Sequence, residues 1–120
     1  MPFAITTTLH FRASHALRMY DGKLEDLHEH NWRVKLTVAA PKLDEIGVVM
    51  DFHDLTRRLE AILQPMRNHG LNDLPPFFDA NPSAENVAVY IARSLNLPPP
   101  AQLESVEVWE TEDNSAIWRG

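Results

Sequence analysis

Three histidines near the N-terminus have the types and spacing of a metal site. His28 and His30 stand two positions apart and lead into Trp32 and further apolar residues at even positions. Side chains two positions apart in a strand share one face, so both imidazoles are expected on the apolar face. The chain has six histidines and no cysteine. With His15 as third ligand, neutral imidazoles suit Zn²⁺ with one coordination position open, which is typical of a catalytic site.

The alternative is that His28 and His30 are ordinary polar residues at the start of a strand. It is less favoured, because unliganded imidazoles among bulky apolar neighbours would have to lose their hydration. The other three histidines, His10, His53 and His69, are expected to be structural or at the surface rather than ligands.

Two groups of carboxylates could add chemistry to this site. Glu110 is in phase with Val106 and Val108, so it points to the side that these valines occupy. A carboxylate there suits a bidentate grip on an arginine or a guanidine-like heterocycle edge, unless it is a solvated strand end. The loop acids Glu25, Asp26 and Glu29 are either a solvated run or, beside Zn²⁺, a source of a ligand-orienting group or a general base.

Hydrophobic periodicity predicts the elements that position these residues. They are, in order, a strand at 3–11, a strand at 30–39, a short extended piece at 47–50, a helix capped by Asp51 that stops near Asn68 or Gly70, a helix capped by Ser83, and strands at 105–111 and 115–119. Residues 12–29 are expected to form a functional loop, and residues 71–82 to be irregular. The order ββααββ predicts an α+β fold with an antiparallel sheet covered by a helix pair.

Length and composition restrict the function classes. A chain of 120 residues with 44% hydrophobic content predicts one domain over residues 1–120. The net charge of −6 argues against nonspecific nucleic-acid binding. No apolar run is long enough to cross a membrane, and the N-terminus lacks the pattern of a signal peptide, so a cytoplasmic location is expected.

Several motifs together resemble the 6-pyruvoyl-tetrahydropterin synthase family, including the 6-carboxy-tetrahydropterin synthases of queuosine biosynthesis. They span essentially the whole chain in the family's order: Phe11-Arg12-Ala13-Ser14-His15, Leu27-His28-Glu29-His30-Asn31-Trp32, Met50-Asp51-Phe52, Leu71-Asn72-Asp73, Asn81-Pro82-Ser83-Ala84-Glu85-Asn86 and Glu110-Thr111.

The resemblance implies a tunnelling fold (T-fold), in which ββααββ subunits join their sheets into a trimeric barrel. Two trimers stack into a hexamer, with reduced-pterin sites between subunits. It also implies that the three histidines bind zinc and that Glu110 holds the 2-amino and N3 edge of the pterin. Thr111 and Ser83 are then expected near the pocket.

The chain departs from the family pattern at the residues that move protons. Leu24 stands at the position of the family's cysteine, and Arg67 and Asn68 stand at the positions of its aspartate and histidine. His69 is one place along and could substitute only if the loop shifts. Glu29 replaces the glycine between the two metal histidines.

These departures leave three possible functions open. Glu25, three residues before His28, could act as the base, as in a subgroup that cleaves the side chain of dihydroneopterin triphosphate by a retro-aldol-like step to 6-hydroxymethyl-dihydropterin. The usual lyase activity could also use another base. The third possibility is a zinc- and pterin-binding protein without lyase activity.

Overall fold

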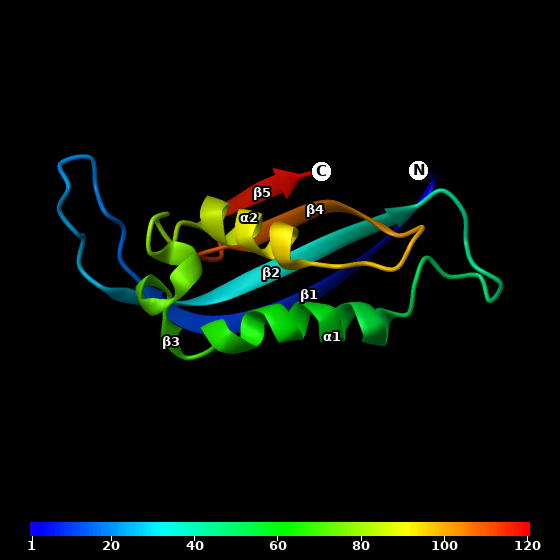
Figure 1. Ribbon diagram of the computed structural model, residues 1–120, viewed down its shortest axis with the longest axis horizontal. Helices are drawn as coiled ribbons and strands as arrows, with labels where there is room; N and C mark the ends of the chain where they lie inside the picture. The colour runs from blue at the N-terminus through cyan, green and yellow to red at the C-terminus, as the bar shows by residue number, and fades with distance from the viewer.

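A five-stranded sheet organises the computed structural model, which describes residues 1–120. Its strands are β1 (Phe3–His15), β2 (His28–Ala40), β3 (His69–Gly70), β4 (Gln102–Trp109) and β5 (Ser115–Arg119). They lie in the order β3-β1-β2-β4-β5, and all neighbours are antiparallel except β3, which is parallel to β1. The predicted α+β class and the ββααββ order of the main elements are confirmed (Figure 1).

The β1–β2 hairpin reaches further than the sequence pattern predicted. Pairing continues past Phe11 to the pair of His15 with His28. The stretch after Phe11 is too polar to show strand alternation. Hydrogen bonding to β2, rather than a hydrophobic pattern, extends the strand there. The predicted functional loop at 12–29 therefore shortens to residues 16–27, and the first two metal candidates are strand residues.

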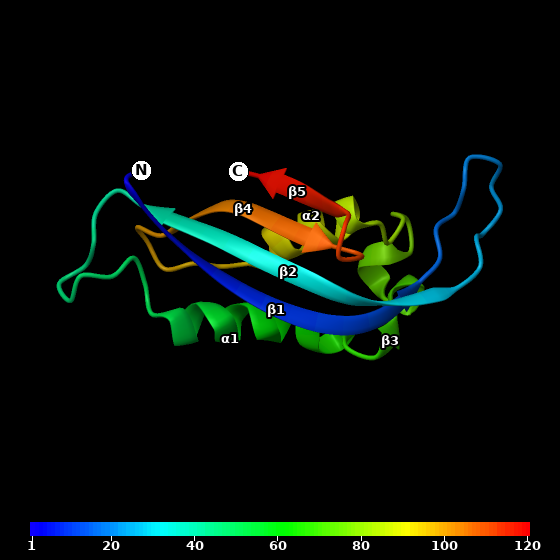
Figure 2. The same ribbon diagram turned by 180° about the vertical axis from the view of Figure 1, so that it is seen from behind.

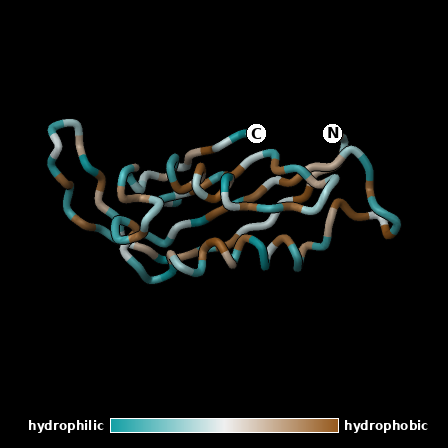
Figure 3. Tube along the Cα trace, in the orientation of Figure 1, coloured by the Kyte–Doolittle hydropathy of each residue, from teal (hydrophilic) through white to brown (hydrophobic).

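Both helices pack on one face of the sheet. They are α1 (Phe52–Leu63) and α2 (Ala84–Ser94), capped as predicted by the side chains of Asp51 and Ser83. Figure 3 shows the mixture of hydrophobic and hydrophilic residues along α1 that produces its apolar stripe. The even-numbered residues of β2 from Trp32 to Val38 are fully buried against these stripes. The same periodicity that buries them brings His28 and His30 to this face.

Several further elements differ from the prediction. The first long helix ends at Leu63 rather than near Asn68 or Gly70, because Pro65 has no N–H to continue the ladder, and a 3₁₀ turn at Gln64–Met66 follows. Residues 47–50 form bends instead of an extended piece. The strand predicted at 105–111 runs from Gln102 to Trp109. The segment predicted to be irregular holds two 3₁₀ turns, Leu71–Asp73 and Pro75–Phe77.

The molecule is elongated, with principal extents of 53 × 26 × 24 Å. Loop 16–27 projects from one end and the loop after β2 from the other (Figure 1). Seen from behind, the sheet lies in front of α2 (Figure 2), so the second face of the sheet carries no helix. Neither helix has the length and apolarity needed to cross a membrane.

Candidate functional site

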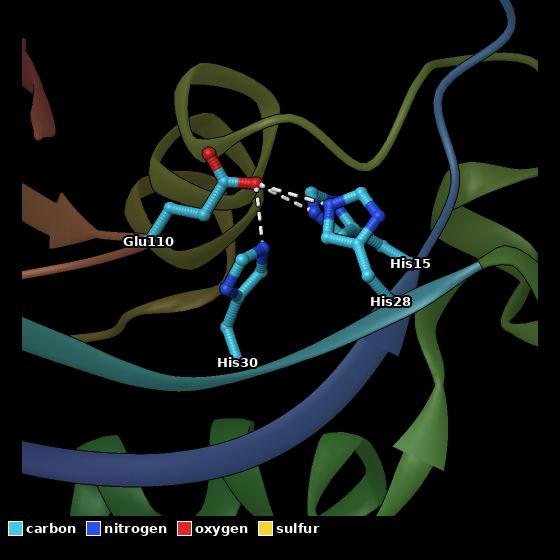
Figure 4. A group of neighbouring side chains, drawn as sticks. All are labelled: His15, His28, His30 and Glu110. Carbon is cyan, nitrogen blue, oxygen red and sulfur yellow. Dashed lines mark ion pairs between the residues drawn. The ribbon is translucent and has the colours of Figure 1, made fainter. Parts of the chain in front are cut away.

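Four side chains converge at the end of the sheet where β1 finishes and β2 starts, next to loop 16–27. His15 is the last residue of β1, His28 and His30 begin β2, and Glu110 follows β4. One ligand atom from each lies within 4.8 Å of the others. The Oε1 atom of Glu110 is 2.6 Å from Nε2 of His15, 3.1 Å from Nε2 of His30 and 3.8 Å from Nε2 of His28 (Figure 4). We call these four residues the His/Glu cluster.

Cross-strand pairing and Trp32 set the positions of the imidazoles. His15 faces His28 directly across the hairpin, and His30 is two residues further along the same face. The indole ring of Trp32 lies edge-on beneath both His15 and His30, with ring centroids 4.9 and 5.7 Å away. Its Nε1 atom donates to the carbonyl of Ala13 at 3.1 Å, which holds the ring in place. A buried aromatic platform thus supports two of the three imidazoles.

Backbone carbonyls select the tautomer of two histidines. Nδ1 of His15 lies 2.7 Å from the carbonyl oxygen of Pro82, and Nδ1 of His28 lies 2.9 Å from that of Asp26. A carbonyl oxygen only accepts, so both Nδ1 atoms carry the hydrogen, and Nε2 presents a lone pair to the cluster in the neutral ring. This is the arrangement by which proteins orient metal-binding imidazoles.

The electrostatics of the cluster also favour a bound cation. Burial lowers the pKa of His30, which favours its neutral form, while the nearby Glu110 carboxylate opposes this shift. The Nε2 atoms of His15 and His30 are buried without a hydrogen-bond partner, and the Oε1 atom of Glu110 lies only 2.6 and 3.1 Å from them. Ring lone pairs that face a carboxylate repel it unless a proton or metal ion is shared. The three imidazoles therefore fit a metal ion with nitrogen ligands, with the Glu110 carboxylate beside it.

Glu25 lies beside the cluster although it belongs to loop 16–27. Its Oε1 atom accepts a hydrogen bond from the backbone N–H of Leu17 at 3.0 Å and lies 3.8 Å from Nε2 of His28. The backbone N–H of Glu25 also donates to the carbonyl of Leu17 at 2.9 Å. Of the three acids predicted in the loop, Glu25 is the one whose carboxylate reaches a cluster histidine. Glu29 points to Arg12, with which it forms an ion pair.

The structure separates the three residues expected at the pterin. Glu110 lines a cavity of about 190 Å³ with residues of α2 and β5. Thr111 lines a different pocket of about 360 Å³ with His10, Arg33 and Trp109. Ser83 caps α2 through its Oγ atom, which accepts from the N–H of Asn86 at 3.1 Å. Within one chain, Glu110 alone of the three joins the histidines.

The residues that the resemblance aligns with proton-moving positions lie outside the His/Glu cluster. Leu24 lies on loop 16–27 and is 60% exposed. Arg67 donates to both carboxylate oxygens of Glu60 and to the carbonyl of His10. Asn68 adopts a left-handed conformation with φ of 58°. His69 is exposed, and its Nδ1 atom lies 2.6 Å from the Arg67 carbonyl, so the structure gives no sign of the loop shift that its use in catalysis would need.

Sequence patterns missed three residues that shape the site. The carbonyl of Pro82 accepts from His15, and the side chains of Asn72 and Asn81 bind the backbone that follows His15. The available signal was their place in the Leu-Asn-Asp and Asn-Pro-Ser motifs. That signal marks a turn and a helix start, and the contact partners lie 56 to 67 positions away.

The Arg67–Glu60 ion pair predicts that part of the free energy of unfolding is lost in acid. Hydrogen bonds from Arg67 lower the pKa of Glu60 below its ordinary value of 4.5. The stabilisation is therefore complete above the unfolded-state pKa and is lost as the pH falls through the folded-state pKa. We expect Glu60→Gln to lower the free energy of unfolding at pH 7 by up to about 1 kcal/mol, given the exposure of the pair. The difference should vanish near pH 3.

Urea unfolding of both proteins at the two pH values measures this effect. Glu45→Gln, in the loop at the far end of the molecule, is the matched control, since Glu45 forms no ion pair. A deficit in Glu60→Gln that persists unchanged at pH 3 would show that the pair is not its cause.

Comparison with known proteins gives a consistent result. The family model of 6-pyruvoyl tetrahydropterin synthase matches residues 4–120. The human 6-pyruvoyl tetrahydrobiopterin synthase is 34% identical over 133 residues, covering 97% of this chain and 90% of the relative. The 6-carboxy-5,6,7,8-tetrahydropterin synthase of Synechocystis sp. is 34% identical over 111 residues, covering 88% and 84%. The solved structure of the Caenorhabditis elegans 6-pyruvoyl tetrahydropterin synthase superposes with a TM-score of 0.85 at 24% identity, covering 100% and 97%. The predicted T-fold is confirmed.

Proposed function

We propose that this chain, which belongs to the 6-pyruvoyl tetrahydropterin synthase family, is a zinc-dependent lyase that acts on the side chain of a reduced pterin. The observation that carries the proposal is the convergence of His15, His28 and His30 with the carboxylates of Glu25 and Glu110 beside them. Imidazole ligands, a nearby base and a carboxylate anchor are the groups that such a reaction needs.

The three histidines would hold the metal through Nε2. Three nitrogen ligands with room for a fourth group suit Zn²⁺. A bound zinc ion would polarise the hydroxyl groups of the substrate side chain and make their protons, and the neighbouring carbon-bound proton, more acidic. His15 is the best-supported ligand, because it is 1% exposed and its Nδ1 atom is already satisfied by the Pro82 carbonyl. Buried without a metal, its Nε2 atom would lack a partner.

Glu25 is the proposed base. The Leu17 N–H holds its carboxylate next to His28, so it can take the proton from the hydroxyl of the second side-chain carbon. The bond between the first and second side-chain carbons then breaks, and the second carbon becomes an aldehyde. Returning the proton to the first carbon gives a 6-hydroxymethyl pterin. Leu24 cannot move a proton, which favours this cleavage over the usual reaction of the family.

Glu110 is the proposed anchor of the pterin. A carboxylate matches the paired donors of the 2-amino and N3 edge in a bidentate contact. Glu110 already lines a cavity with residues of α2 and β5, and a cation held by the histidines would leave its carboxylate available to a ligand there. Ser83 would act indirectly, by capping α2 behind the Pro82 carbonyl. Thr111 faces another pocket in the same chain, so its contact with a pterin would require a site between subunits.

We further propose that the chain assembles as its family resemblance implies, with a trimeric barrel and a stacked hexamer. The edge strand β5 supports this proposal, because its outer side is unpaired and Ile117 is exposed there. A cytoplasmic role in a pterin or queuosine pathway remains part of the same proposal.

The competing function is a zinc- and pterin-binding protein without lyase activity. The specific observation in its favour is the tie of Arg67 to Glu60 and of His69 to the Arg67 carbonyl, which leaves no second acid or base of the usual kind in contact with the cluster.

Metal analysis followed by product chromatography separates these functions. Purified protein should contain about one zinc per chain and convert dihydroneopterin triphosphate to 6-hydroxymethyl-dihydropterin. Chelation should stop turnover, and added Zn²⁺ should restore it. Tight pterin binding without product after prolonged incubation would establish the inactive alternative. Protein that binds neither metal nor pterin would reject both.

A further inference from the structure

We propose that Asn72 and Asn81 are positioning residues that clamp the backbone of Ala16, Leu17 and Arg18, and thereby hold the Glu25 carboxylate against His28. These three backbone residues are called the 16–18 segment. The inference rests on the proposed function for the role of Glu25. The clamp itself is a geometric claim that can be tested without turnover.

Each asparagine binds one residue of the segment at two points, as a neighbouring strand would. The Asn72 side chain accepts from the N–H of Ala16 at 2.9 Å and donates to its carbonyl at 2.7 Å. The Asn81 side chain accepts from the N–H of Arg18 at 2.7 Å and donates to its carbonyl at 2.9 Å. The first and third residues of the segment are thus held by two side-chain amides that lie 56 and 63 positions away in the sequence.

Leu17, the middle residue of the segment, is the residue that contacts Glu25. Leu17 bonds to Glu25 twice, through its N–H to the carboxylate and through its carbonyl to the Glu25 N–H. Arg18 also forms a β-bridge with Leu24. The rest of the loop projects from the body of the molecule (Figure 1), with Tyr20, Leu24 and Leu27 exposed. The position of Glu25 therefore depends on the 16–18 segment.

The same clamp is connected to the metal ligands. Asn81 is followed by Pro82, whose carbonyl orients the His15 ring. Asn86, in the first turn of α2, donates to the carbonyl of Asn81 at 2.9 Å. One short stretch before α2 therefore places both the His15 imidazole and the backbone that carries Glu25. The stretch therefore sets the position of the proposed base, Glu25, relative to the metal ligands. A misplacement of about 1 Å in such a position can cost about 10²-fold in rate.

An amide is required at these positions because each side chain both donates and accepts. An aspartate of the same shape accepts only, so its second oxygen would face the carbonyl of Ala16 or Arg18. Asn72→Asp and Asn81→Asp are therefore sharp tests that leave little change in volume. Asn96→Asp, beyond α2, is the matched control, because no hydrogen bond of the Asn96 side chain is present.

The first experiment measures amide hydrogen exchange of the zinc-loaded proteins at Leu17 and Glu25. The Leu17 N–H donates to the Glu25 carboxylate and the Glu25 N–H donates to the Leu17 carbonyl, so neither amide bonds to Asn72 or Asn81. Their exchange rates therefore report movement of the 16–18 segment. In each Asn→Asp variant we expect their exchange to accelerate at least about tenfold, with α1 and β4 unchanged. Unchanged exchange at both amides would overturn the clamp. Acceleration throughout the protein would show general destabilisation and also overturn it.

The second experiment connects the clamp to Glu25 by a double-mutant cycle. Asn81→Asp should lower kcat by about 10- to 100-fold with KM and zinc content nearly unchanged. In a Glu25→Gln background the same change should cost no further activity, because the positioned group is already gone. Additive losses would overturn the positioning role. If the wild type has zinc but no turnover, the proposed function fails, and the exchange result still decides the clamp.

Discussion

Replacing His28 by alanine is expected to reduce zinc binding below stoichiometry in purified protein and to abolish turnover. The substitution removes one of three nitrogen ligands. Even the loss of a group that only hydrogen-bonds to a metal ligand typically costs about 10- to 100-fold in metal affinity. The loss here should exceed that range. His28 is the most exposed of the three histidines, so its removal leaves no deep cavity. Elemental analysis and competition with a chromogenic chelator give the two measurements.

The effect should also appear in thermal stability. A metal that binds only the folded chain raises its stability by mass action. Added Zn²⁺ should therefore raise the Tm of the chelated wild type but not that of His28→Ala. His53→Ala is the matched control, because His53 is exposed at the start of α1 and far from the cluster. Full zinc content in His28→Ala would remove this residue from the ligand set.

Replacing Glu25 by glutamine is expected to lower kcat by about 10²- to 10⁴-fold, the range for loss of a positioned base. Glutamine keeps the size of the side chain and an oxygen that can accept from the Leu17 N–H, but it cannot take a proton. Zinc content and pterin affinity should therefore stay near the wild-type values. Single-turnover kinetics with product chromatography measure the chemical step apart from binding.

Glu45→Gln serves as the matched control for this substitution, because it removes the same charge in the distant loop. Wild-type kcat in Glu25→Gln would remove Glu25 from the mechanism and point to another base. Loss of zinc in that variant would instead assign Glu25 a role as a metal ligand.

The local sequence determined much of the fold and the histidine part of the cluster. Alternation along β2 placed His28 and His30 on the face of Trp32, and side-chain caps at Asp51 and Ser83 marked both helix starts. These features depend on residues within a few positions of one another, which is why periodicity and capping rules predict them. The phase of Glu110 with Val106 and Val108 likewise predicted that its carboxylate points to the side of these valines, which the structure shows to be the side of the histidines.

Only the tertiary structure decided how these parts meet. The strand carrying His15 extends because it pairs with β2, the His15 ring is turned by the Pro82 carbonyl, and Glu25 reaches His28 through backbone held by Asn72 and Asn81. Arg67 is drawn away to Glu60, and Thr111 faces another pocket. Most of these outcomes depend on hydrogen bonds between segments that lie far apart in the sequence, and the position of Thr111 depends on the face of the sheet to which the chain turns after β4. Local patterns carry little information about such contacts, because their partners meet only when the whole chain has folded.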